Sequence, residues 1–239
     1  MNRKVNRLCL AALLLGGATA AEAQENKIET TVEADIVSQY IWRGQDLGDV
    51  SFQPALGISY KGLSLGAWGN VGLSDPDDTK EFDITLAYSL GGLNIGVTDY
   101  WFNEGLDPKG RYFMYEAHRT NHVFEANVGY DFGPLAFQWY TNFAGNDGLT
   151  KKGKRAYSSY FEFDVPFKLA TVEWNAAVGA VPYATSFYGT NGFAVTNISI
   201  TATKDIKITD SFTIPVFGQL AANPQSQKAY LVFGLKLRP

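Results

Sequence analysis

Residues 28–42, Ile-Glu-Thr-Thr-Val-Glu-Ala-Asp-Ile-Val-Ser-Gln-Tyr-Ile-Trp, alternate in polarity at every second position. The even positions are mostly apolar and end in Tyr40 and Trp42. The odd positions include three carboxylates, those of Glu29, Glu33 and Asp35. A period of two is typical of a strand with one face in an apolar medium and the other in water. Globular strands usually have about 5–6 residues, whereas a tilted strand that crosses a bilayer needs about 9–11. The stretch therefore predicts an outer-membrane β-barrel.

The first residues are typical of an export signal. Three basic residues within the first seven precede an apolar segment at 8–18, and Ala21-Glu22-Ala23 fits the small-residue pattern of a cleavage site. We therefore predict a cleaved signal peptide over residues 1–23 and a single barrel domain over residues 24–239. No later stretch offers about 18 consecutive apolar residues, so a membrane location would require a closed barrel.

Cysteine usage and charge exclude several classes of protein. The one cysteine, Cys9, lies in the predicted signal peptide, so we expect neither disulfides nor thiolate metal sites in the exported chain. The sequence has 20 basic and 24 acidic residues, of which the signal peptide contains three and one, leaving 17 against 23 and a net charge of −6. An acidic chain is a poor candidate for nucleic-acid binding. Charged residues make up 18% of the sequence, below the roughly 25% of soluble domains.

Alternating segments continue along the chain and predict about twelve antiparallel strands. Short connections alternate with long ones, and the short ones fall around 61–62, 91–92, 132–134, 166–170 and 205–209. Bacterial barrels have this rhythm, with short periplasmic turns, long extracellular loops and an even strand number. The apolar parity switches near Thr196–Asn197, where we expect a β-bulge. Asp99 shares the parity of Val97, which would direct a carboxylate toward lipid.

Aromatic residues gather near the predicted strand ends, as the girdles of a membrane barrel require. They are Tyr40, Trp42, Phe52, Trp101 and Phe143 at one rim, and Tyr60, Tyr88, Tyr130 and Trp174 at the other. The alternative fold is a secreted β-sandwich, whose apolar faces point inward. Alternation alone does not separate the two folds, but strand length, loop rhythm and girdles together favour the barrel.

Segments within residues 35–90 resemble the TorF-type porin family. They are Ser38-Gln39-Tyr40-Ile41-Trp42-Arg43-Gly44, Ser51-Phe52-Gln53-Pro54-Ala55, Gly66-Ala67-Trp68-Gly69-Asn70-Val71 and the acidic strand start Glu81-Phe82-Asp83-Ile84. The aromatic character of the chain resembles versions found in Bacteroides-type bacteria. The resemblance implies an outer-membrane barrel with a channel function, and it supplies no catalytic residues and no substrate. The chain departs from many outer-membrane proteins by ending in Leu237-Arg238-Pro239 rather than in an aromatic residue.

If the even positions of the first strand face lipid, the opposite face of the wall lines a lumen. The same parity predicts as pore-lining residues Glu29, Glu33, Asp35, Arg43, Asp83, Glu125, Asp131, Glu162, Asp164 and Glu173, together with Lys236. Rings of carboxylates favour cations or neutral polar solutes. The alternative is a closed interior filled by salt bridges and hydrogen bonds between these side chains. Two roles remain open for Arg43: a bidentate contact with carboxylates that narrows the entrance, or a structural pin for the first loop.

The two histidines give weak site hypotheses. His118 and His122 lack an evident third ligand for a metal ion. A barrel hydrolase would need a histidine with serine and acid partners, and Ser158, Ser159 and Asp99 are present, but no spacing indicates a triad. We therefore expect no enzyme activity, no metal site and no cofactor.

Two loops are rich in charged residues, and the simplest interpretation of both is a loop exposed to solvent. Asp75, Asp77 and Asp78 lack the spacing of a calcium-binding loop. The basic residues 151–155 would either contact lipopolysaccharide phosphates or keep their loop soluble.

These patterns together predict a channel in the outer membrane of a Gram-negative bacterium, through which small polar or cationic solutes diffuse passively. The sequence identifies neither the solute nor the oligomeric state. Expected partners are outer-membrane lipid, lipopolysaccharide and small polar solutes, with no nucleic acid. The main alternative is a non-conducting barrel that binds a ligand or surface partner, or acts as a structural protein. A barrel hydrolase is the third.

Overall fold

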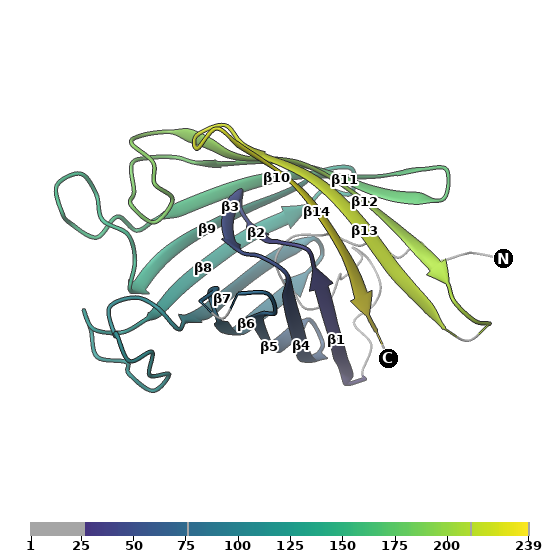
Figure 1. Ribbon diagram of the computed structural model, residues 1–239, viewed down its shortest axis with the longest axis horizontal. Helices are drawn as coiled ribbons and strands as arrows, with labels where there is room; N and C mark the ends of the chain where they lie inside the picture. Colours follow the sequence, from purple (N-terminus) through teal and green to yellow (C-terminus); the bar gives the residue numbers. More distant parts are fainter. Residues whose placement is uncertain (1–26, 76, 211, 239) are drawn as a thin grey trace.

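The computed structural model describes residues 27–75, 77–210 and 212–238. The predicted signal peptide, residues 1–23 with Cys9, lies outside the described residues. Figure 1 shows the strands of the described chain curving around a common interior. Twelve of them form a closed antiparallel barrel, which confirms the fold predicted from the sequence.

The barrel wall follows the order of the chain, each strand pairing with the one before and the one after it. Its strands are β1 (Glu29–Val37), β4 (Ser51–Tyr60), β5 (Leu63–Gly72), β6 (Glu81–Leu90), β7 (Leu93–Phe102), β8 (His122–Asp131), β9 (Ala136–Gly145), β10 (Ser159–Leu169), β11 (Val172–Val181), β12 (Ala194–Lys207), β13 (Thr213–Asn223) and β14 (Lys228–Leu237). The barrel closes where β1 pairs with β14, from Ala34 opposite Leu237 to Val37 opposite Gly234. Closure removes the edges that an open sheet would leave unpaired.

The first strand is shorter than the alternation predicted. β1 ends at Val37, and the chain then leaves the wall. Residues Tyr40–Trp42 form β2, which pairs with β3 (Gln45–Gly48) in a separate two-stranded sheet. Between them Arg43 and Gly44 both have positive φ, at 50° and 76°. That backbone is what a two-residue hairpin turn requires, so the predicted long strand is in fact a wall strand followed by a small hairpin.

The predicted alternation of short and long connections is confirmed except in the last pair, where the connection 224–227 is shorter than the turn 208–212. Two-residue turns at 61–62 and 91–92 join β4 to β5 and β6 to β7. The turns predicted around 166–170 and 205–209 lie at 170–171 and 208–212, because β10 and β12 run on to Leu169 and Lys207. All short turns lie at one rim, and the connections 38–50, 73–80, 103–121, 146–158, 182–193 and 224–227 lie at the other. We call these the short-turn rim and the long-loop rim.

The predicted bulge in the tenth segment is confirmed. On β11, Gly179 is opposite Asn197 and Ala180 is opposite Val195, so Thr196 is the extra residue of β12. The extra residue shifts the alternation by one position, so odd-numbered residues face outward before the bulge and even-numbered residues face outward after it. Ile198 and Ile200 therefore share the exposed outer face.

The two faces of the wall differ in polarity as the alternation predicted. Large apolar side chains of the outer face remain exposed on nearly every wall strand; among them are Val32, Leu56, Leu65, Leu86, Ile95, Val128, Phe163, Val178, Ile200, Leu220 and Phe233. Two of the predicted girdle residues are not on this face, because Tyr40 and Trp42 are buried in the interior. No helix in the described ranges is long and apolar enough to cross a membrane.

Candidate functional site

The connection between β1 and β4 folds into the barrel. We call residues 38–50, which contain β2 and β3, the L1 hairpin. Its aromatic side chains belong to one buried cluster with side chains of the wall and of the connection 182–193: Tyr40, Trp42, Tyr100, Val123, Tyr140, Tyr160, Val181 and Tyr188. Trp42 meets Tyr100 edge-on, with ring centroids 5.9 Å apart, and stacks on Tyr188 at 6.1 Å. The L1 hairpin therefore fills interior space toward the long-loop rim.

Arg43, at the tip of the L1 hairpin, reaches a carboxylate of the wall. Its Nη1 and Nη2 donate to the two oxygens of Glu125 on β8, at 2.6 and 2.9 Å, and Nη1 also donates to the Tyr188 hydroxyl at 2.6 Å. The exposed fractions of the two charged side chains are only 6% and 2%. The guanidinium also lies over the rings of Trp42, Tyr140 and Tyr160, at 4.3, 4.0 and 4.9 Å from their centroids. Arg forms such bidentate and stacked contacts because its guanidinium is planar.

The backbone of the tip is also fixed. Gly44 lies so close to the bulge of β12 that a Cβ atom there would lie 1.8 Å from the carbonyl oxygen of Thr196. From the neighbouring strand, Asn223 donates its Nδ2 to the Gly44 carbonyl oxygen at 2.9 Å. The tip thus touches β8 on one side and β12 and β13 on the other. These contacts fix the tip of the L1 hairpin against the wall, as expected of a structural pin, and a narrowing of the entrance by Arg43 stays a prediction.

Other buried carboxylates surround this contact, and neutral donors hold most of them. Tyr40 donates to Glu81 at 2.9 Å, and Tyr100 donates to Glu125 at 2.9 Å. Deeper in the wall, Glu162 accepts from Tyr160 and Asn197, and Asp164 accepts from Asn175 at 2.8 Å. Asp83 is buried as well, and its Oδ1 has no hydrogen-bond partner.

The predicted pore-lining residues fall into two groups. Arg43, Asp83, Glu125, Glu162 and Asp164 are buried in the interior. The others remain partly or fully exposed: Glu29, Glu33, Asp35, Asp131 and Glu173.

Most of this second group pairs with neighbouring groups. Asp35 pairs with Lys236 at 3.0 Å, Glu33 with Arg238 at 3.4 Å and Glu173 with Lys168 at 3.7 Å. Asp131 accepts from the backbone of Gly133 in a turn. Among the described members of the set, the buried carboxylates without a cationic partner are those of Asp83, Glu162 and Asp164, and the partly or fully exposed ones are those of Glu29 and Asp131.

Several residues of the site escaped the sequence prediction. Tyr100, Tyr140 and Tyr160 lie on wall strands at positions whose parity could have placed them inside. Glu81 begins a strand, where parity is hard to assign. Tyr188 lies in an irregular connection, where no alternation of polarity indicates which way a side chain points.

The histidines do not form a hydrolase site in the described chain. His122 Nδ1 lies 2.7 Å from Asp99 Oδ1, but its Nε2 faces the backbone oxygen of Tyr112 at 2.6 Å rather than a serine. Ser158 and Ser159 are engaged elsewhere, with Thr185 at 2.6 Å and Tyr183 at 2.7 Å. A nucleophile is therefore absent from the histidine–carboxylate pair.

The acidic residues 75–78 and the basic residues 151–155 were the two charged loops predicted from the sequence, and two carboxylates of the first form hydrogen bonds with nearby backbone. Asp75 accepts from the backbone of Asp77 at 2.8 Å, and Asp78 accepts from the backbone of Asp49 at 3.1 Å. Residues 151–154 are exposed. Among the residues that the structure describes, no group of three or more His, Cys, Asp or Glu side chains is placed to hold a metal ion.

Comparison with known proteins gives likenesses of fold alone. No family model and no curated protein matches the sequence. Among solved structures, the NanC porin is 8% identical, with a TM-score of 0.43 over 88% of this chain and 98% of that chain. The KdgM porin is 8% identical, with a TM-score of 0.45 over 87% and 99%. An outer-membrane channel from Pseudomonas putida F1 is 12% identical, with a TM-score of 0.38 over 92% and 97%.

Proposed function

We propose that this chain is an outer-membrane channel for passive diffusion of small polar or cationic solutes, exported by a cleaved signal peptide and narrowed by the L1 hairpin. The observation that carries the proposal is the contact of Arg43 with Glu125 inside a closed barrel. A loop held within a barrel reduces the space through which a solute can pass. Membership of the TorF-type family is part of the same proposal and rests on the motifs within residues 35–90.

The outer face supports a location in the membrane. Its large aliphatic and aromatic side chains stay exposed around the barrel, which is unfavourable in water and favourable in hydrocarbon. The closed sheet also pairs the backbone polar groups of the wall, as hydrocarbon requires. Together these features suit a barrel that spans the bilayer, with the long loops extracellular.

The interior charge supports a preference for cations. On the described wall strands five carboxylates are buried, those of Glu81, Asp83, Glu125, Glu162 and Asp164. Arg43 is the one buried Lys or Arg side chain in the described ranges, and Glu125 already pairs with it. An excess of carboxylates along a pore attracts cations and repels anions.

A second candidate is a non-conducting barrel that binds a ligand at its loops. It is favoured by the dense aromatic packing around the L1 hairpin, where Tyr160 is only 1% exposed. A hollow of about 420 Å³ also lies between the connections 146–158 and 182–193, lined by Leu149, Lys151, Thr185, Ser186 and Asn191 among others. Conductance separates this candidate from the channel.

The test is single-channel recording of the refolded residues 24–239 in a planar bilayer under a salt gradient. We expect small, discrete conductance steps with a cation-selective reversal potential. Asp164→Asn removes one of the buried carboxylates and should move the reversal potential toward zero. Glu33→Gln and Asp35→Asn should weaken the preference less, because Arg238 and Lys236 already pair with these carboxylates.

A matched control removes the same charge from the surface. Asp210→Asn alters a side chain in the turn after β12 that is fully exposed, and it should leave the reversal potential unchanged. Silence from a correctly folded barrel would overturn the channel and favour the ligand-binding alternative. An anion-selective wild type would refute the role of the acidic interior.

A further inference from the structure

The longest connection, residues 103–121, turns outward over the wall instead of into the lumen. We call its residues 111–115 the L3 apron. The ring of Tyr112 packs edge-on against Phe82 and Trp101, with centroids 5.6 and 5.7 Å apart. Phe82 belongs to the exposed outer face of β6, together with Ile84 and Leu86. The apron therefore lies on the outer surface of the barrel at the long-loop rim.

The L3 apron covers a polar pair that would otherwise face outward. Asp99 and His122 lie on the outer face of β7 and β8 and contact each other at 2.7 Å. The His122 ring lies against Tyr115 at 4.1 Å and Tyr112 at 5.1 Å, and it is completely buried. A bare polar pair on a lipid-facing wall is costly. This packing explains how the chain tolerates a carboxylate at the apolar parity of Asp99.

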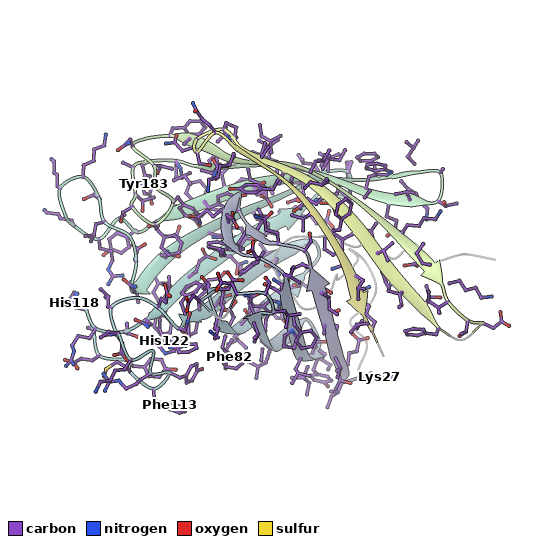
Figure 2. The ribbon with its side chains drawn as sticks, viewed as in Figure 1. Lys27, Phe82, Phe113, His118, His122 and Tyr183 are labelled. Atoms are coloured by element: carbon purple, nitrogen blue, oxygen red, sulfur yellow. The ribbon has the colours of Figure 1, made fainter. Side chains whose placement is uncertain are left out.

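The apron itself leaves a large aromatic side chain uncovered. Phe113 contacts Tyr112 edge-on at 5.1 Å and is 86% exposed. That fraction exceeds the exposure of every large outward-facing apolar residue on the described wall strands. Figure 2 shows Phe113 at the outer edge of the molecule, on the side of the wall that carries Phe82 and His122. Phe113 therefore extends the apolar outer face of the wall beyond the ends of the strands.

The backbone that presents Phe113 is braced. The Asp107 carboxylate accepts from the Arg111 side chain at 3.0 Å and from the backbone nitrogens of Lys109 and Arg111. These hydrogen bonds, above all those from the Arg111 side chain, lower the pKa of Asp107 to about 2. Asn121 accepts from the Asp107 backbone at 2.7 Å and joins the brace to β8.

Exposed cationic side chains stand beside the aromatic ones. Lys109, Arg111 and Arg119 are all exposed within the same connection, although Arg111 and Arg119 also pair with Asp107 and Glu116. Cationic groups next to an apolar surface suit the boundary where lipid phosphates meet acyl chains, and aromatic side chains gather at that depth.

We propose that the L3 apron is a lipid contact that holds Phe113 at the interface of the outer leaflet and shields Asp99 and His122 from hydrocarbon. The occupant of this surface is outer-leaflet lipid. The inference rests on the membrane location proposed above but not on conductance.

The test places a single spin label on the apron of the full chain. Cys9 is the one cysteine of the sequence, so Cys9→Ser combined with Phe113→Cys gives a unique labelling site. In phospholipid vesicles we expect the nitroxide to be more accessible to oxygen than to a water-soluble nickel chelate. Two reference sites bracket it: Leu86→Cys on the outer face for hydrocarbon, and Lys152→Cys on an exposed loop for water.

Each outcome has a distinct meaning. An oxygen-to-nickel ratio between the two reference sites supports the lipid contact. A ratio equal to that of Lys152→Cys would overturn it, and exclusion of both reagents would show that a second copy of the chain covers the apron instead. If Leu86→Cys also behaved as an aqueous site, the membrane location itself would have failed.

Discussion

Replacing Gly44 by valine is expected to release the L1 hairpin and raise the single-channel conductance several-fold. A side chain at this position would meet the backbone oxygen of Thr196, since even a Cβ atom would lie 1.8 Å from it. Gly44 also has φ of 76°, a conformation that costs a β-branched residue roughly 1–3 kcal/mol. The hairpin tip can satisfy neither constraint in place, so it must leave the bulge of β12. Its departure would open the interior at the long-loop rim.

A matched glycine separates the steric conflict from the backbone strain. Gly153 has φ of 70°, close to that of Gly44, but a Cβ atom there would meet nothing within 4 Å. Gly153→Val should therefore leave the conductance at the wild-type level. If Gly44→Val formed a folded barrel with unchanged conductance, the L1 hairpin would not be the element that limits passage.

The wall of the barrel was predictable because its physical cause is local. In strands such as β6, Phe82, Ile84 and Leu86 lie on one face and Asp83 and Thr85 on the other. The polarity of each side chain there indicates whether its face lies in an apolar or a polar environment. The bulge at Thr196 was predictable for the same reason, since a change of parity within one strand requires an extra residue.

The prediction that Tyr40 and Trp42 belong to the outer aromatic girdle was wrong, because the alternation continues unbroken from β1 into β2. Both segments are strands, so the sequence pattern is the same whether the aromatic face meets lipid or the barrel interior. A local signal for the break was present at Arg43-Gly44. It matches Lys61-Gly62, which forms a two-residue turn with φ of 51° and 83°.

The composition of the site depends on contacts between distant parts of the chain. Parity alone placed Asp83, Glu125, Glu162 and Asp164 on the interior face, where they are buried. It could not pair Arg43 with Glu125 and Tyr188, which lie 82 and 145 positions further along the chain. Such partners are set by barrel closure and by loop packing, neither of which leaves a periodic trace.

The second large effect is expected from Glu125→Gln. Glutamine keeps the shape of the side chain and one acceptor oxygen, but it leaves the Arg43 charge buried without a counter-charge. Breaking a buried pair in this way typically costs about 3–5 kcal/mol. We expect a lower midpoint of urea unfolding for the refolded barrel in lipid vesicles, together with larger and more variable conductance as the L1 hairpin loses its anchor.

The double variant Arg43→Met with Glu125→Gln distinguishes a paired charge from a mere loss of packing. Methionine can occupy the space among Trp42, Tyr140 and Tyr160 without a charge, so it should recover much of the stability lost in Glu125→Gln, with a coupling energy of at least about 1 kcal/mol.

The control is Glu116→Gln, since that carboxylate and Arg119 are 57% and 61% exposed and should contribute less than about 1 kcal/mol. Equal effects of Glu125→Gln and Glu116→Gln would contradict the proposal, because a pair that is truly desolvated cannot be as cheap to break as one in water. A restored midpoint accompanied by a still-raised conductance would instead mean that the charge of Arg43, rather than the bulk of the L1 hairpin, limits the passage of ions.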